Sequence, residues 1–340
     1  MGRNLTVLGR MTLAGIFLGG FLACPKPAPA PRPNLDLSYF PSDVLFVAYA
    51  DTVHLKESPL YRAWDARVPE GPDRLTETKT FLRRLGIDPE KDLDGVMVAY
   101  RLSPDTGGNW LALLRGRFDL GRMTKGLEEP SARMSARPYG RWTVYSLALV
   151  PGVGDVSLAM VDPSAIALGK VTTLKKVLDT RDAPQQSLSA NAMMRQLVSN
   201  LPSSAQIGAF LDGRSLSRAL RDQRGSLPQG LDAPVTSNLS SIVSADLSAT
   251  LTADLALRLE IGSDSPKHAQ SLSDALKGIL GFARLGQGVK DPDLARLVDA
   301  VRVDGQGERV VLRLDVPGDL AKRLEAGKKD DGDREGAATR

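Results

Sequence analysis

The feature that most constrains the fold is an apolar run of eleven residues that is partly repeated later in the chain. Residues 41–51 read Pro-Ser-Asp-Val-Leu-Phe-Val-Ala-Tyr-Ala-Asp, and residues 202–212, 161 positions further on, read Pro-Ser-Ser-Ala-Gln-Ile-Gly-Ala-Phe-Leu-Asp. Four of the eleven positions are identical: the leading Pro-Ser, an Ala and the closing Asp. Residues 44–50 are apolar on both faces of a strand, which predicts an interior strand. We therefore expect two copies of one unit, each opening with this strand.

Strand and helix signals alternate through the rest of both copies. Strands are expected at 95–102, 110–118, 141–149, 156–161, 165–169, 205–211, 242–251, 254–261, 300–304 and 308–315. Helices are expected at 73–85, 119–129, 171–178, 191–198, 266–283 and 318–325. Strands joined by short hairpins, with helices between them, predict an α+β fold: two pseudo-repeats of antiparallel or mixed sheet with helices packed mainly on one face.

The predicted order of segments begins with a signal peptide at 1–23 and a proline-rich tether at 24–38. A first α+β unit at 39–199 and a second at 200–326 follow. Residues 327–340 are charged and rich in Gly, which predicts a disordered tail.

Composition excludes some classes of protein. A hydrophobic content of 42% in 340 residues is too high for a wholly disordered chain. The formal charge of +4 includes Arg3 and Arg10 of the signal, and without them 42 Lys and Arg face 40 Asp and Glu. These charges are interspersed and form no basic stripe, so nucleic acid is rejected as a partner.

The N-terminus has the pattern of an export signal. Arg3 and Arg10 precede an uncharged, mostly apolar stretch at 11–23, which is shorter than the roughly 20 residues of a membrane-spanning helix. Phe21-Leu-Ala-Cys24 resembles a bacterial lipobox, although Phe21 and Leu22 are bulkier than the usual pattern. The resemblance implies cleavage between Ala23 and Cys24 and a lipid on Cys24, which would tether the protein to a membrane. Cleavage after Ala28 or Ala30, with plain secretion, or an uncleaved anchor are the alternatives.

The residues after Cys24 bear on location. Proline occupies alternate positions of 25–33, which predicts a stiff polyproline spacer of roughly 28 Å. Pro25, where inner-membrane lipoproteins carry Asp, favours the outer membrane by the sorting rule of enteric bacteria. We expect a cell-envelope protein on the outer membrane, with secretion or inner-membrane anchoring as the alternative.

The folded part also resembles exported bacterial families of unknown function. The likeness rests on Pro41-Ser-Asp with its Val-Ala and Asp51, on Ser58-Pro-Leu-Tyr61 and on the stretch Leu85-Gly-Ile-Asp-Pro with Asp92-Leu-Asp94. It covers roughly residues 40–212. It implies an envelope setting and no activity.

We find no motif of a catalytic or cofactor site. The chain lacks a nucleophile elbow, a Walker loop, a zinc-protease motif and a dinucleotide fingerprint. One cysteine and two histidines, 214 residues apart, do not suit a disulfide or a zinc site. The acidic pairs Asp92/Asp94, Glu128/Glu129 and Asp291/Asp293 are expected to be helix caps and solvated groups. The sequence therefore predicts no metal and no cofactor.

The remaining candidates form a weak binding patch after the first strand: Asp51, His54, Tyr61 and Trp64. The leading hypothesis is a non-enzymatic, membrane-tethered envelope lipoprotein that binds a protein partner or has a structural role. The first alternative is a periplasmic binding or carrier domain for an apolar ligand. The second is an enzyme with a dispersed acidic site.

Overall fold

The computed structural model describes residues 35–65, 80, 82–83, 85–101, 109–128, 134–150, 154–222, 240–284 and 292–323. They belong to one compact unit that begins at Pro33. The strands are β1 (Phe46–Asp51), β2 (Leu93–Arg101), β3 (Asn109–Gly116), β4 (Met134–Tyr139), β5 (Trp142–Val150), β6 (Gly154–Asp162), β7 (Ala165–Gly169), β8 (Ile207–Asp212), β9 (Ile242–Leu251), β10 (Leu255–Ser263), β11 (Val301–Gln306) and β12 (Arg309–Val316).

The α-helices are α1 (Thr52–Glu57), α2 (Pro59–Asp65), α4 (Leu120–Glu128), α5 (Val171–Asp182), α6 (Ala192–Asn200), α7 (Gly213–Asp222), α9 (Pro266–Arg284) and α10 (Pro292–Ala300). Residues 318–323 are also helical. Short 3-10 helices lie at η1 (Leu37–Tyr39), η3 (Pro184–Gln186) and η4 (Leu188–Ala190).

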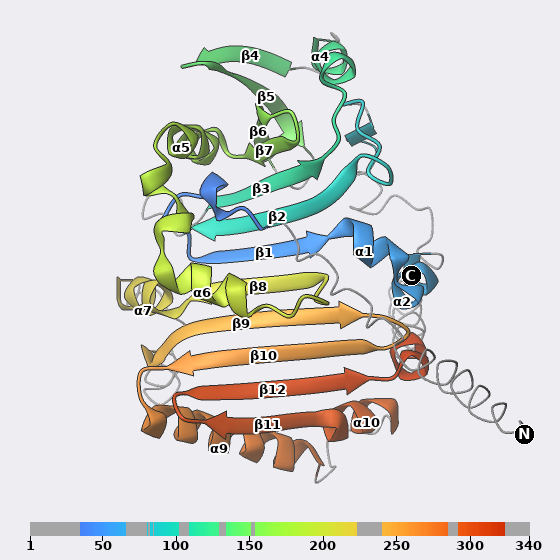
Figure 1. Cartoon of the computed structure of the whole chain (residues 1–340), viewed down its shortest axis with the longest axis vertical. Helices are drawn as coiled ribbons and strands as arrows, with labels where there is room; N and C mark the ends of the chain where they lie inside the picture. Colours follow the sequence, from blue (N-terminus) through green and yellow to red (C-terminus); the bar gives the residue numbers. More distant parts are fainter. Residues whose placement is uncertain are drawn as a thin grey trace, which may run out of the picture. The chain divides into compact units, whose positions relative to one another are not determined.

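The described strands form one continuous sheet of 12 strands in the order β11-β12-β10-β9-β8-β1-β2-β3-β7-β6-β5-β4 (Figure 1). Neighbouring strands pair antiparallel throughout. The α+β class is thus confirmed, and the sheet is antiparallel rather than mixed.

The two similar stretches are neighbours in the sheet. β1 pairs with β8, and Ala48 lies opposite Ala209 at the middle of the paired segment. Tyr49 lies opposite Gly208, where a Cβ atom would come within 2.2 Å of the Tyr49 ring. A glycine at this position therefore lets the aromatic ring lie across the neighbouring strand.

One face of the sheet, here called the Tyr49 face, carries Val47 and Tyr49. It is packed by α5 and α6 in the largest apolar cluster, which includes Leu174, Val177 and Met194. Phe210 of β8 belongs to the same cluster and stacks on Tyr49 with ring centroids 6.3 Å apart. The core of the Tyr49 face therefore joins the chain on both sides of the β1–β8 pair.

The opposite face, here called the Ala48 face, carries Phe46, Ala48 and Ala50. Its two ends are covered. Met123 and Leu127 of α4 pack on β6 and β7 at one end, and Leu272 and Leu276 of α9 pack on β11 and β12 at the other. The prediction that the helices lie mainly on one face is wrong. Successive residues of β1, β3 and β7 are apolar, so both faces of this part of the sheet bury apolar side chains.

Most predicted elements are confirmed within a few residues, including β2, β3, β7, β9, β12 and α9. β4 was not predicted, because its sequence Met-Ser-Ala-Arg-Pro-Tyr contains a proline and alternates poorly. Helix 73–85 lies largely outside the described residues, as do the signal peptide, most of the tether and the tail.

Candidate functional site

Asp51 and His54 lie together at the end of β1. The Asp51 carboxylate accepts a hydrogen bond from the His54 backbone N–H at 3.1 Å and caps α1. Its second oxygen lies 2.7 Å from His54 Nδ1. Both carboxylate oxygens are therefore engaged locally. The pair holds the start of α1.

Tyr61 and Trp64 lie on the next helix, α2. Trp64 packs against a small apolar cluster of Leu60, Val316 and Leu320. Its indole Nε1 is buried with no hydrogen-bond partner. Trp64 therefore contributes apolar surface to the core rather than an exposed binding patch.

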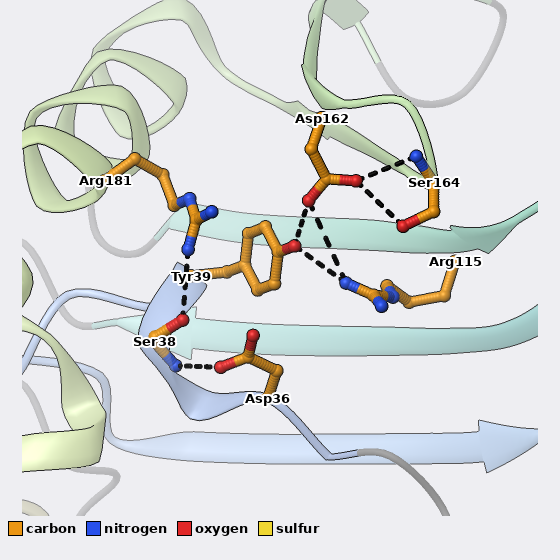
Figure 2. Close-up of polar contacts among 7 residues, drawn as sticks. All are labelled: Asp36, Ser38, Tyr39, Arg115, Asp162, Ser164 and Arg181. Atoms are coloured by element: carbon orange, nitrogen blue, oxygen red, sulfur yellow. Dashed lines mark hydrogen bonds and ion pairs between the residues drawn. The ribbon is translucent and has the colours of Figure 1, made fainter.

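Sequence reasoning missed a buried polar cluster around Tyr39, at the start of the folded unit (Figure 2). The Tyr39 hydroxyl donates to the Asp162 carboxylate and accepts from Arg115 Nη1 at 2.7 Å. The other Asp162 oxygen accepts from the backbone and side chain of Ser164, each at 2.8 Å. The Arg181 guanidinium lies 4.3 Å from the centre of the Tyr39 ring. These contacts join η1 to β3, α5 and the β6–β7 turn.

The protonation of this cluster suits a structural role. Burial and the hydrogen bond to Asp162 raise the pKa of Tyr39 to about 12. Burial alone would raise the pKa of Asp162, but hydrogen bonds from Tyr39 and Ser164 and the charge of Arg115 outweigh it and lower that pKa. Tyr39 is thus a fixed donor and Asp162 a fixed acceptor. The cluster therefore holds η1, the first described helix of the chain, against the rest of the folded unit.

The middle of the Ala48 face is apolar at every position across five consecutive strands. Cross-strand pairing places three residues of each strand in this set, here called the central apolar face: Val96, Val98, Tyr100, Phe46, Ala48, Ala50, Ile207, Ala209, Leu211, Ala245, Leu247, Ala249, Leu257, Leu259 and Ile261. The Tyr100 hydroxyl is the only polar side-chain group among them.

The central apolar face is partly open to solvent. Val98, Tyr100 and Leu247 are 38%, 37% and 36% exposed, well above the level of a packed core. The α4 cluster and the α9 cluster lie to either side of it. Ala48 and Ala209 face each other at its middle, and Val98 and Leu247 flank them. Two small side chains side by side make the centre of this face lower than its flanks.

The Tyr49 face has a contrasting acidic pair on β9 and β10. Asp246 and Glu260 are both buried and lie directly opposite each other. Glu260 is bound by Arg258 and by Arg309, the latter at 2.8 Å. Burial and the neighbouring Glu260 charge raise the pKa of Asp246 to about 6, against the weaker opposing effect of the two arginines.

Of the other residues singled out in the sequence, some serve local structure and some lie outside the described part of the chain. Cys24 lies outside it. Asp92 accepts from the Asp88 backbone N–H at 2.7 Å, and Asp293 pairs with Arg323 at 2.9 Å, so both serve local structure. Among the described residues no group of three His, Cys, Asp or Glu side chains is placed to hold a metal ion. Within the same residues no helix is long and apolar enough to cross a bilayer.

Comparison of the chain with protein-family models, with curated proteins and with solved structures finds no match.

The sequence contains a signal for the central apolar face. Residues 245, 247 and 249 of β9 alternate with Ser244, Asp246 and Ser248, which is the period of a strand with one apolar face. That alternation indicates that one face of β9 is apolar. It gives no indication that α4 and α9, of the described helices, pack at the two ends of the Ala48 face.

Proposed function

We propose that this protein is a non-enzymatic outer-membrane lipoprotein, tethered through a lipid on Cys24, that binds the hydrocarbon chain of an apolar ligand on the central apolar face. The observation that carries the proposal is the run of fifteen apolar positions across β2, β1, β8, β9 and β10 in a sheet whose centre is still partly exposed. Monomeric proteins rarely expose a contiguous apolar patch without a binding role.

The chemistry of the face favours hydrocarbon over a protein partner. Protein interfaces concentrate their binding energy in Trp, Tyr and Arg and surround it with polar groups. Here aliphatic side chains dominate, and Phe46 and Tyr100 are the only aromatic members. The strand backbones pair with one another, so the face offers a ligand only apolar contact.

The free energy gained by burying a hydrocarbon chain on this face is sufficient for reversible binding. A hydrocarbon chain that buries about ten methylene groups gains roughly 8 kcal/mol from burial. The loss of translational and rotational freedom reduces this figure. We therefore expect an affinity in the micromolar range or weaker, as suits a carrier that must release its ligand.

We also propose that the folded part of the chain contains two copies of one unit. Outward from the β1–β8 pair, the order β1-β2-β3-β7-β6 matches the order β8-β9-β10-β12-β11. Asp51 and Asp212 both end their strands, and the carboxylate of each caps the following helix. These features support two copies of one unit, with boundaries at 39–199 and 200–326. β4 and β5 would be an addition to the first copy.

The ligand hypothesis is tested by titrating the full chain carrying Cys24→Ser with a fluorescent long-chain fatty acid. Leu247→Lys places a charge on the central apolar face at a position that is exposed enough to tolerate it. We expect saturable binding to the parent chain and at least tenfold weaker binding to Leu247→Lys. Ala209→Leu, which fills the low centre of the face, should weaken binding by steric exclusion.

The matched control is Val171→Lys, at a similarly exposed apolar residue on α5. It should bind the fatty acid as the parent does. Absence of saturable binding to the parent, or equal loss in Leu247→Lys and Val171→Lys, would contradict the proposed function.

The tether is tested separately by growing a bacterial host with labelled palmitate. We expect the label to enter the protein through Cys24 and to be absent from Cys24→Ala. Label that persists in Cys24→Ala would refute the lipid anchor and would leave the ligand hypothesis intact.

A further inference from the structure

The C-terminal half of α9 carries two unusually exposed apolar side chains. Ile279 is 66% exposed and Phe282 is 82% exposed, the highest values among the large apolar residues that the structure describes. They are three positions apart, so they lie on one side of the helix. The stripe that packs on β11 and β12 is a different one, which includes Leu276 and Leu280.

The helix surface beside these two residues is open at two positions. A Cβ atom added at Gly278 or at Gly281 would meet nothing within 4 Å. Ile279 and Phe282 therefore project next to two positions that carry no side chain. Helix formation gives no reason for this choice, because Gly, Ile and Phe are all poorer helix formers than Ala or Lys. The residue types of this stretch are therefore explained better by the exposure of apolar side chains than by the stability of the helix.

Basic residues bracket the exposed pair. Lys277 precedes it and is exposed. Arg284 follows it, and its guanidinium is held at the helix end by the Val301 carbonyl at 3.2 Å and by Asp299 at 3.4 Å. Asp299 offsets the charge of Arg284, so Lys277 is the cation that could meet a lipid headgroup. Protruding apolar side chains next to an exposed lysine fit a bilayer with anionic lipids: the apolar groups reach the acyl boundary while the ammonium group remains among the headgroups.

We propose that the Lys277–Arg284 end of α9 is a membrane-contact site, at which Ile279 and Phe282 insert into the surface of a bilayer that contains anionic lipid. A protein partner is a poorer fit, because a stable protein interface needs some 20 to 30 residues per side. Two projecting residues suffice for shallow insertion when another segment holds the protein near the membrane, as the lipid on Cys24 would in the cell and the apolar residues 11–23 would in the unprocessed chain. The site is distinct from the central apolar face and does not depend on the proposed ligand.

The test places a reporter beside the site itself. In the full chain carrying Cys24→Ser, Gly281→Cys supplies a single thiol at an open position for an environment-sensitive fluorophore. Vesicles of phosphatidylethanolamine with phosphatidylglycerol are compared with vesicles of phosphatidylcholine. Sedimentation with vesicles would not discriminate, because residues 11–23 are themselves apolar. The emission of the local fluorophore reports on α9 alone.

We expect a blue shift with the anionic vesicles and a smaller one with phosphatidylcholine. The double substitution Ile279→Ser and Phe282→Ser should remove the shift. Lys277→Gln should weaken the response to anionic vesicles several-fold and leave the response to phosphatidylcholine unchanged. Val171→Ser, which removes an exposed apolar side chain from α5, is the matched control and should keep the full shift.

Far-UV circular dichroism checks that the double variant is folded, which we expect because both residues are exposed. A blue shift that survives the double substitution would overturn the proposal. A shift that appears without vesicles and grows with protein concentration would also overturn it, because it would assign the site to a second copy of this chain.

Discussion

At the scale of single residues, the informative groups are buried and half-buried polar side chains that bind one another. Tyr39 and Asp162 satisfy each other inside the fold, with Arg115 and Ser164 completing their hydrogen bonds. In the buried acidic pair of Asp246 and Glu260 the negative charge is compensated unevenly. The described ion pairs of Arg258 and Arg309 are both with Glu260. A raised pKa in such a position lowers stability at neutral pH.

Asp246 gives a pH dependence whose sign is fixed by its pKa. The pKa rises from 3.8, the ordinary value, to about 6 in the folded protein. Between these values the folded state holds the proton more tightly than the unfolded chain, so the free energy of unfolding falls as pH rises. We expect Asp246→Asn to match the parent near pH 4 and to be more stable by roughly 2–3 kcal/mol at about pH 7. Urea unfolding at a series of pH values measures the difference.

The control for this prediction is Asp264→Asn. Asp264 is exposed, and its pKa is lowered chiefly by the hydrogen bond from His268, so its loss should bring no gain in stability as pH rises. Acids common to both chains cancel in the difference between variant and parent. A difference for Asp246→Asn that does not change with pH would show that Asp246 has no raised pKa.

At the scale of elements, local signals predicted most of the strands and helices. α9 covers Pro266–Arg284, close to the helix expected at 266–283, and β9 covers Ile242–Leu251, the strand expected at 242–251. Strand partners were harder to predict, because pairing depends on contacts between distant residues. The pairing of β1 with β8 illustrates this. The neighbouring Tyr49 ring explains the glycine at position 208, which aligns with Val47 when residues 202–212 are compared with 41–51.

The candidate sites likewise divide into one built from neighbours in the sequence and others built from residues far apart in the chain. Asp51 and His54 were predicted as part of a binding patch, and the structure places them together because they are neighbours in a helix cap. The Tyr39 cluster was not, since its hydrogen bonds join residues 76 and 123 positions apart in the chain. The apolar side of β9 is visible in the alternation of its residues. The exposure of that side depends on where α4 and α9 pack, which no local pattern specifies.

At the scale of the folded unit, the two halves share a sheet and a core. β1 and β8 pair over five residue pairs. The main cluster combines Leu174 and Val177 of the first half with Leu201 and Phe210 of the second. Separate unfolding of one half would expose this apolar surface on the other. We therefore infer that the halves unfold together, although each has the elements of a small domain.

This cooperativity is measurable because the tryptophans are all in the first half of the chain. In a Trp64→Phe background the remaining indoles are Trp110 and Trp142, which pack in the clusters around β3 and β5. Far-UV circular dichroism reports on both halves. We expect the urea transitions followed by fluorescence and by circular dichroism to coincide.

A substitution remote from both indoles sharpens the test. Val310 is fully buried under α9 in the second half, and Val310→Ala should cost about 1–3 kcal/mol. If the sheet unfolds as one unit, this loss moves the fluorescence midpoint of the first half by the same amount as the circular dichroism midpoint. If fluorescence is unmoved while circular dichroism becomes biphasic, the pairing of β1 with β8 joins two domains of independent stability. In that case the central apolar face, which spans this pair, would be a surface between two movable halves.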